Sequence, residues 1–152
     1  MDATGVSHIA ICVRDIDKSL EFYRDTLGMT VGYDRIQDTT TGGLPHVYAH
    51  PRKTRRQVRL NICEGENSPT ITMTTHPDED ADGDPIKLDQ VGISHFSISV
   101  PDLQGLADRL ASQGVEFAGP LDSRLNAQGE VTSFYVYDPD GILLQFDRGG
   151  GG

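Results

Sequence analysis

The sequence predicts an α+β fold built from two βαβββ modules. Eleven residues from Gly5, GVSHIAICVRD, recur from Gly92 as GISHFSISVPD, which is an offset of 87 residues. That offset is too long for a solenoid repeat, so it indicates two related modules. Each copy also continues in the same way, with an alternating strand, a capped helix and room for three further strands. A length of 152 residues can bury a core for one domain of ordinary size.

The first module begins with a strand in which apolar and small or polar side chains alternate from His8 to Val13. Asp15 is placed to cap a helix whose apolar residues run to Leu27, and Gly28 is placed to end it. Three strands then follow, which we expect near 29–36, 46–50 and 57–63.

The second module repeats this order from His95, with Asp102 as the helix cap and Gly114 at the helix end. Its later strands are expected near 115–118, 131–137 and 142–147. The sequence DPDG at 138–141 predicts a tight turn between the last two of them.

These patterns predict one domain over residues 1–152, with module one at 5–66, an acidic linker at 67–91, module two at 92–148 and a flexible glycine tail at 149–152. The linker holds five acidic residues among the seven positions 78–84 and has no apolar periodicity. We therefore interpret it as an exposed loop.

The chain is acidic, with 13 basic and 23 acidic residues and a formal net charge of −10. This charge disfavours nucleic acid and anionic membranes as partners. No apolar run approaches the ~18 residues of a membrane span, and no signal peptide is evident. Its two cysteines form no disulfide framework, so we expect a reduced, cytoplasmic protein.

Strand alternation predicts which side chains share a face. The apolar residues pack under each helix, which leaves polar residues on the opposite face: His8, Cys12, Arg59, Asn61 and Cys63 in module one, and His95, Ser97, Tyr135, Tyr137 and Gln145 in module two. If the modules pair by pseudo-symmetry, these faces form one cleft. Asn61 and Gln145 then form a second symmetric pair, 53 and 50 residues after the two histidines.

The segments SHIAICVRDIDKSLEFYRDTLGM, LNICEG, GISHFSISVPDL and SFYVYDPDGILLQFD resemble the vicinal oxygen chelate superfamily, which contains glyoxalases, bleomycin resistance proteins and extradiol dioxygenases. The resemblance implies two paired βαβββ modules forming a curved mixed sheet around a cleft. It also implies a divalent metal (Zn, Mn, Ni, Co or Fe) held from the first and last strands of each module. Residue by residue, the ligands would be His8, His95, Gln145 and Asn61.

Gln145 stands where the family usually has glutamate, so this ligand set is neutral and should bind metal more weakly. Gln145 could instead hydrogen-bond the substrate, and Asn61 could be a polar group of the pocket. The general base is unassigned, with Tyr135 and Glu64 as candidates. The remaining expected substrate contacts are Arg59, Cys63, Ser97, Tyr135 and Tyr137.

The leading hypothesis is a small-molecule enzyme with metal-assisted isomerase, epimerase or lyase chemistry on an oxygen-chelating substrate. One alternative is a metal-free protein of the bleomycin-resistance type that binds an antibiotic or another aromatic ligand. A second is a ring-cleaving extradiol dioxygenase, although such enzymes need a carboxylate beside two histidines on iron. We expect a small-molecule ligand and a homodimer.

Overall fold

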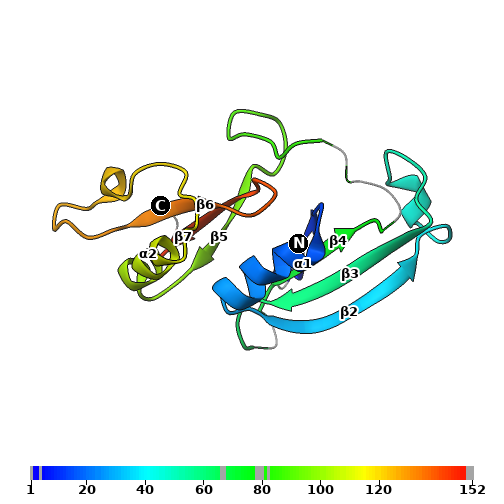
Figure 1. Cartoon of the computed structure of the whole chain (residues 1–152), viewed down its shortest axis with the longest axis horizontal. Coiled ribbons are helices and arrows are strands. Elements are labelled where there is room, and N and C mark those ends of the chain that lie inside the picture. Colours follow the sequence, from blue (N-terminus) through cyan, green and yellow to red (C-terminus); the bar gives the residue numbers. More distant parts are fainter. Residues whose placement is uncertain (1, 4, 66–67, 78–80, 82, 150–152) are drawn as a thin grey trace. The chain divides into compact units, whose positions relative to one another are not determined.

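The computed structural model describes residues 2–3, 5–65, 68–77, 81 and 83–149. The chain divides into two compact units, Met1–Asp82 and Gly83–Gly152 (Figure 1). Each unit contains its own helix and its own sheet, and each is described here by itself. The predicted acidic stretch at 78–80 and 82, and the tail at 150–152, lie outside the described residues.

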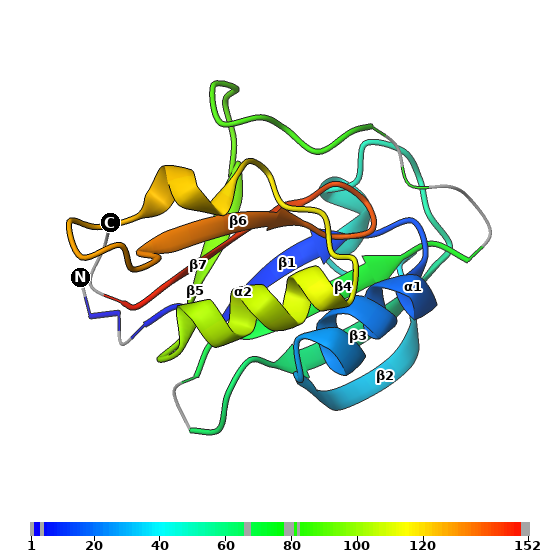
Figure 2. The ribbon, with the colours of Figure 1, turned by 60° about the vertical axis from the view of Figure 1, so that its left-hand side comes forward.

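Unit 1 has the βαβββ order that the sequence predicts. Its elements are β1 His8–Cys12, α1 Ile16–Leu20, a π-helical turn Glu21–Thr26, β2 Thr30–Asp38, β3 Thr54–Asn61 and β4 Thr70–Thr75. The strand order in the sheet is β1-β4-β3-β2, with β1 parallel to β4 and the other pairs antiparallel. Figure 2 shows α1 lying along one face of this sheet.

One face of this sheet forms the core of unit 1. The register places Ile71 of β4 between Ile9 of β1 and Leu60 of β3. Ile71 and Leu60 are fully buried, as is Tyr23 from the helical segment. The predicted cap is confirmed, because the Asp15 carboxylate accepts hydrogen bonds from the backbone N–H groups at the start of α1.

Two predictions for module one are wrong, one about a strand and one about where the module ends. The strand expected at 46–50 is absent, and Leu44–His46 forms a 3₁₀ turn within a loop. This loop is closed at its base, where the Thr39 hydroxyl donates to the Arg52 carbonyl at 2.7 Å. The last strand of the module, β4, lies instead inside the segment predicted to be linker. Module one therefore extends well beyond residue 66.

Unit 2 is a shorter version of the same arrangement. Its elements are β5 His95–Ser99, α2 Leu103–Ser112, a 3₁₀ turn Leu121–Arg124, β6 Ser133–Tyr137 and β7 Leu143–Asp147. The strand order is β5-β7-β6, with β5 parallel to β7. The strand expected at 115–118 is reduced to a single bridge between Phe117 and Val136.

The local signals in module two are confirmed. Asp102 caps α2, with its carboxylate accepting from the Gly105 N–H at 2.9 Å. The turn between β6 and β7 is held by Asp138, whose Oδ1 accepts from the N–H groups of Asp140 at 2.9 Å and Ile142 at 2.8 Å. Gly141 follows at φ +84°, a conformation that favours glycine. This turn fixes where β7 begins.

Across the described residues, no helix has both the length and the apolar character needed to cross a membrane.

Candidate functional site

The first and last strands of the two units pair in the same register. In unit 1, His8 lies opposite Thr70. In unit 2, His95 lies opposite Leu143. Two residues further along, Ala10 lies opposite Thr72, and Ser97 lies opposite Gln145. Thr72 therefore occupies in unit 1 the position that Gln145 occupies in unit 2.

This register corrects the sequence-based pairing of Asn61 with Gln145. Asn61 ends β3, the neighbour of the last strand, and lies opposite Thr70. It does share the polar face with His8, and its Nδ2 donates to the Thr30 hydroxyl at 3.4 Å. The alternation of threonine with Ile71 and Met73 in TITMTT was the signal that could have located β4, and with it Thr72.

The two histidines are held in the same way by the serine that precedes each. Ser7 Oγ lies 3.0 Å from His8 Nδ1, and Ser94 Oγ lies 3.0 Å from His95 Nδ1. An imidazole that donates from Nδ1 carries its lone pair on Nε2, the atom that can bind a metal ion. The duplicated Ser-His pair thus orients two potential ligands alike.

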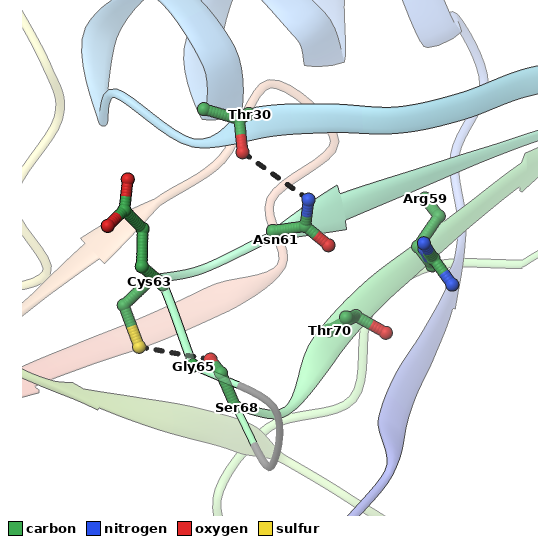
Figure 3. A pocket seen from close by; sticks show the side chains of 8 residues that line it. Thr30, Arg59, Asn61, Cys63, Gly65, Ser68 and Thr70 are labelled. Atoms are coloured by element: carbon green, nitrogen blue, oxygen red, sulfur yellow. Dashed lines mark hydrogen bonds between the residues drawn. The ribbon is translucent and has the colours of Figure 1, made fainter.

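Unit 1 contains a pocket of about 420 Å³ on the polar face of its sheet. Its lining residues are Thr30, Arg59, Asn61, Cys63, Glu64, Gly65, Ser68 and Thr70. Four residues that the sequence singled out, Arg59, Asn61, Cys63 and Glu64, are therefore brought together. Figure 3 shows Arg59 on one side of the pocket and Cys63 on the other, with Cys63 Sγ 3.0 Å from the Ser68 hydroxyl.

The other arginines of β3 are engaged elsewhere. Arg55 donates two hydrogen bonds to Gln37, at 2.8 and 3.0 Å. Arg56 forms ion pairs with Asp34 at 2.7 Å and Asp17 at 2.9 Å. The Arg56 guanidinium holds the pKa of the Asp34 carboxyl below its usual range, chiefly through their hydrogen bonds. These side chains are therefore engaged in contacts within unit 1.

The polar face of unit 2 gathers His95, Ser97, Tyr135, Tyr137 and Gln145. Gln145 lies between Ser97 and Tyr135 in the register. The rings of His95 and Tyr135 meet edge to face, with 5.6 Å between centroids. Gln145 thus has the hydroxyl side chain of Ser97 on one side and the aromatic ring of Tyr135 on the other.

Asp147 accepts hydrogen bonds at the outer end of the same face. Its carboxylate accepts from the hydroxyls of Ser97 at 2.6 Å and Ser99 at 3.1 Å, and from the Gly149 N–H at 2.7 Å. These bonds, that of Ser97 foremost, lower the pKa of Asp147. The group therefore stays ionised at neutral pH and is a poor proton acceptor. The sequence did not predict this hydrogen bond between Ser97 and Asp147.

The side chains available as ligands determine how strongly a metal ion would bind. Within the described residues, no group of three or more His, Cys, Asp or Glu side chains could hold an ion. The residues at the duplicated positions are two imidazoles, His8 and His95, with the neutral oxygens of Gln145 and Thr72. Imidazole nitrogen suits divalent first-row ions. Each unit by itself thus offers one imidazole and one neutral oxygen, donors that hold a divalent ion less strongly than a set with a carboxylate.

Two curated relatives match almost the full chain. An ethylmalonyl-CoA/methylmalonyl-CoA epimerase of Cereibacter sphaeroides is 26% identical over 144 residues, covering 94% of this chain and 96% of the relative. A probable lactoylglutathione lyase of Synechocystis is 29% identical over 142 residues, covering 91% and 90%.

Solved structures show the same fold. A glyoxalase family protein from Bacillus cereus has a TM-score of 0.73 at 14% identity, covering 96% of this chain and 94% of the other. A mutant fosfomycin resistance protein from Listeria monocytogenes, complexed with Mn(II), has a TM-score of 0.58 at 21% identity, covering 97% and 92%. The profile of one family matches residues 5–146. The chain therefore belongs to the Glyoxalase/Bleomycin resistance protein/Dioxygenase superfamily.

Proposed function

We propose that the protein is a divalent-metal-assisted isomerase, epimerase or lyase acting on a small substrate that offers two oxygens for chelation. The observation that carries this proposal is the duplicated Ser-His pair, with the same 3.0 Å contact to Nδ1 in both units. The two nearly full-length relatives, one named as an epimerase and one as a lyase, support this class of reaction.

In this proposal His8 and His95 would hold the ion, and Gln145 and Thr72 would supply neutral oxygens to it or orient the substrate. When bound, the ion would polarise substrate oxygens and so stabilise negative charge developing beside them. Asn61, in the same row as His8, is assigned to the substrate rather than to the ion.

Proton movement needs a group outside the ligand set. Glu64 lines the unit 1 pocket, and a carboxylate is one of the side chains that serve as a general base. Tyr135 lies against His95, and its phenol can donate a hydrogen bond. We therefore assign Glu64 as the general base and Tyr135 as a donor to a substrate oxygen, with Ser97, Tyr137 and Cys63 as flanking contacts.

Metal content is the first test. Protein purified without chelators and offered Zn, Mn, Ni, Co or Fe in turn should retain about one ion per chain, as measured by elemental analysis. His8→Ala and His95→Ala should each lose it, whereas His46→Ala, an exposed histidine in the 3₁₀ turn, should not. Failure to retain any of the five ions would sink the metal-assisted function.

Chemistry is tested by solvent deuterium exchange. The loaded enzyme should catalyse wash-in of deuterium next to the carbonyl of a carboxylated acyl thioester or of a glutathione thiohemiacetal. Glu64→Gln should abolish this exchange and leave metal content unchanged. Exchange at the wild-type rate in Glu64→Gln would remove Glu64 from the role of base.

A metal-free binding protein is the second candidate. The neutral oxygens of Thr72 and Gln145 favour it, since neither supplies charge to offset a cation. It would bind an aromatic ligand without metal and show no deuterium exchange. The dioxygenase alternative has less support, because the carboxylate of Asp147 is already occupied by three hydrogen-bond donors.

We also propose a cytoplasmic homodimer. Cys12 and Cys63 are exposed and form no disulfide within the described chain, which suits a reducing compartment.

A further inference from the structure

We propose that the unit 1 pocket is a binding site for a carboxylate, held by Arg59, so that the substrate is a small molecule carrying one carboxylate besides its chelating oxygens. Only the statement that the bound molecule is the substrate depends on the proposed function. Carboxylate binding by the pocket is a property of unit 1 and can be measured without metal.

The charge of Arg59 is the first support. Among the described residues no hydrogen bond or ion pair reaches its guanidinium, in contrast to Arg56, which contacts two aspartates. Its cross-strand neighbour on β4 is Thr72, a neutral residue. A guanidinium with five donors and no acidic partner is suited to bind a carboxylate bidentately.

The backbone of β2 makes room for this guanidinium. The register shifts between Val31 and Tyr33, so that Gly32 lies at a bulge opposite Arg59. A Cβ at Gly32 would come within 2.8 Å of Arg59 Nε. The Tyr33 ring supports the other side, with its centroid 5.1 Å from Arg59 Cζ. The side chain is thus positioned by its surroundings without being neutralised.

The remaining lining supplies neutral hydrogen-bond donors and no second cation. Asn61, Thr30, Thr70 and Ser68 offer neutral amide or hydroxyl donors, and Arg59 is the cation among the lining residues while Glu64 is the acid. A carboxylate carries one charge, which Arg59 can match. A phosphate near neutral pH carries between one and two, and no second cation among the lining residues offsets the excess.

The pocket adjoins a proposed ligand. Thr70, part of its lining, lies directly opposite His8. Arg59 lies on β3, two strands from β1, which is a lateral separation of about 10 Å. A small molecule that contacts both Arg59 and His8 must therefore span this separation.

The test uses the full-length, metal-stripped chain and butyrate, with inorganic phosphate as the second anion. Titration is followed by NMR of the Arg59 Nε–H and Asn61 Nδ2–H₂ signals. Butyrate should shift both signals saturably, and phosphate should bind at least tenfold more weakly. Absence of a saturable shift, or tighter binding of phosphate, overturns the proposal.

Three variants test whether butyrate binds at Arg59. Arg59→Gln should weaken butyrate binding at least tenfold. Gly32→Ala should weaken it at least threefold while keeping the charge, because the new methyl group displaces the guanidinium. Arg35→Gln is the matched control: Arg35 also lies over the Tyr33 ring, at 4.6 Å, but donates to Gln57 and does not line the pocket. An equal loss in Arg35→Gln would refute the assignment to Arg59.

The experiments distinguish failure of the carboxylate site from failure of the proposed function. Metal retention without butyrate binding would overturn the carboxylate site alone. Butyrate binding without metal retention would overturn the metal-assisted function and leave the carboxylate site in place. Thermal melting of each variant within a few degrees of wild type shows that the loss is not unfolding.

Discussion

Replacing Asp138 by alanine removes the acceptor that closes the turn between β6 and β7. Its Oδ1 receives two backbone N–H groups at 2.8–2.9 Å, and the residue is 5% exposed. A hydrogen bond to a charged group contributes about 1.5–3 kcal/mol, and the two here share one atom, so they should not add fully. We expect Asp138→Ala to lower the free energy of unfolding by about 2–4 kcal/mol, a large part of the ~5–15 kcal/mol of a typical domain.

Urea denaturation followed by far-UV circular dichroism measures this change, since the chain has no tryptophan. Asp138→Asn keeps an oxygen acceptor and should lose less than half as much. Asp122→Ala, at an exposed carboxylate in the same unit, should change stability by less than about 0.5 kcal/mol. If Asp138→Ala matched Asp122→Ala, or if the asparagine and alanine variants lost equal stability, the assigned role of the carboxylate would be refuted.

Three further outcomes are expected. Gln145→Glu should raise metal affinity at least tenfold in a chelator competition assay, because it adds charge to the donor set; unchanged affinity would remove Gln145 from that set. Ser7→Ala and Ser94→Ala should each weaken metal binding about 10–100-fold and alter the tautomer of the adjacent histidine seen by ¹⁵N NMR, whereas a threonine at either position should preserve both. The lowered pKa of Asp147 stabilises the fold above the ordinary value near pH 4, and this contribution is lost as pH falls through the lowered pKa. Ser97→Ala should make this acid destabilisation shallower, and identical pH profiles would contradict the assignment.

Local signals in the sequence predicted most of the local structure. Alternation from His8 and from His95 gave both first strands and the face of each histidine, and Asp15 and Asp102 gave both helix starts. These features depend on neighbouring residues alone, through side-chain period and the exposed N–H groups of a helix end.

The pairing of the strands was harder to predict from the sequence. The alternating run HVYAH at 46–50 has strand-like chemistry, yet it lies in a loop because β3 already occupies the place beside β2. The run TITMTT pairs on both sides, with β1 and with β3, and only that pairing identifies it as the last strand. Thr72 could not be matched to Gln145 until this register was known, because unit 1 places more residues than unit 2 between its first and last strands.

The bulge at Gly32 has a consequence for solubility as well. β2 is the terminal strand of its sheet, and it carries Val31 and Ile36 at 42% and 61% exposure. A regular, apolar edge of that kind is a template for pairing with other chains, and bulges and charged side chains are two means of blocking it. The irregularity at Gly32, with Asp34 and Arg35 just beyond it, interrupts this edge. A change that straightened β2 would therefore promote aggregation in addition to crowding Arg59.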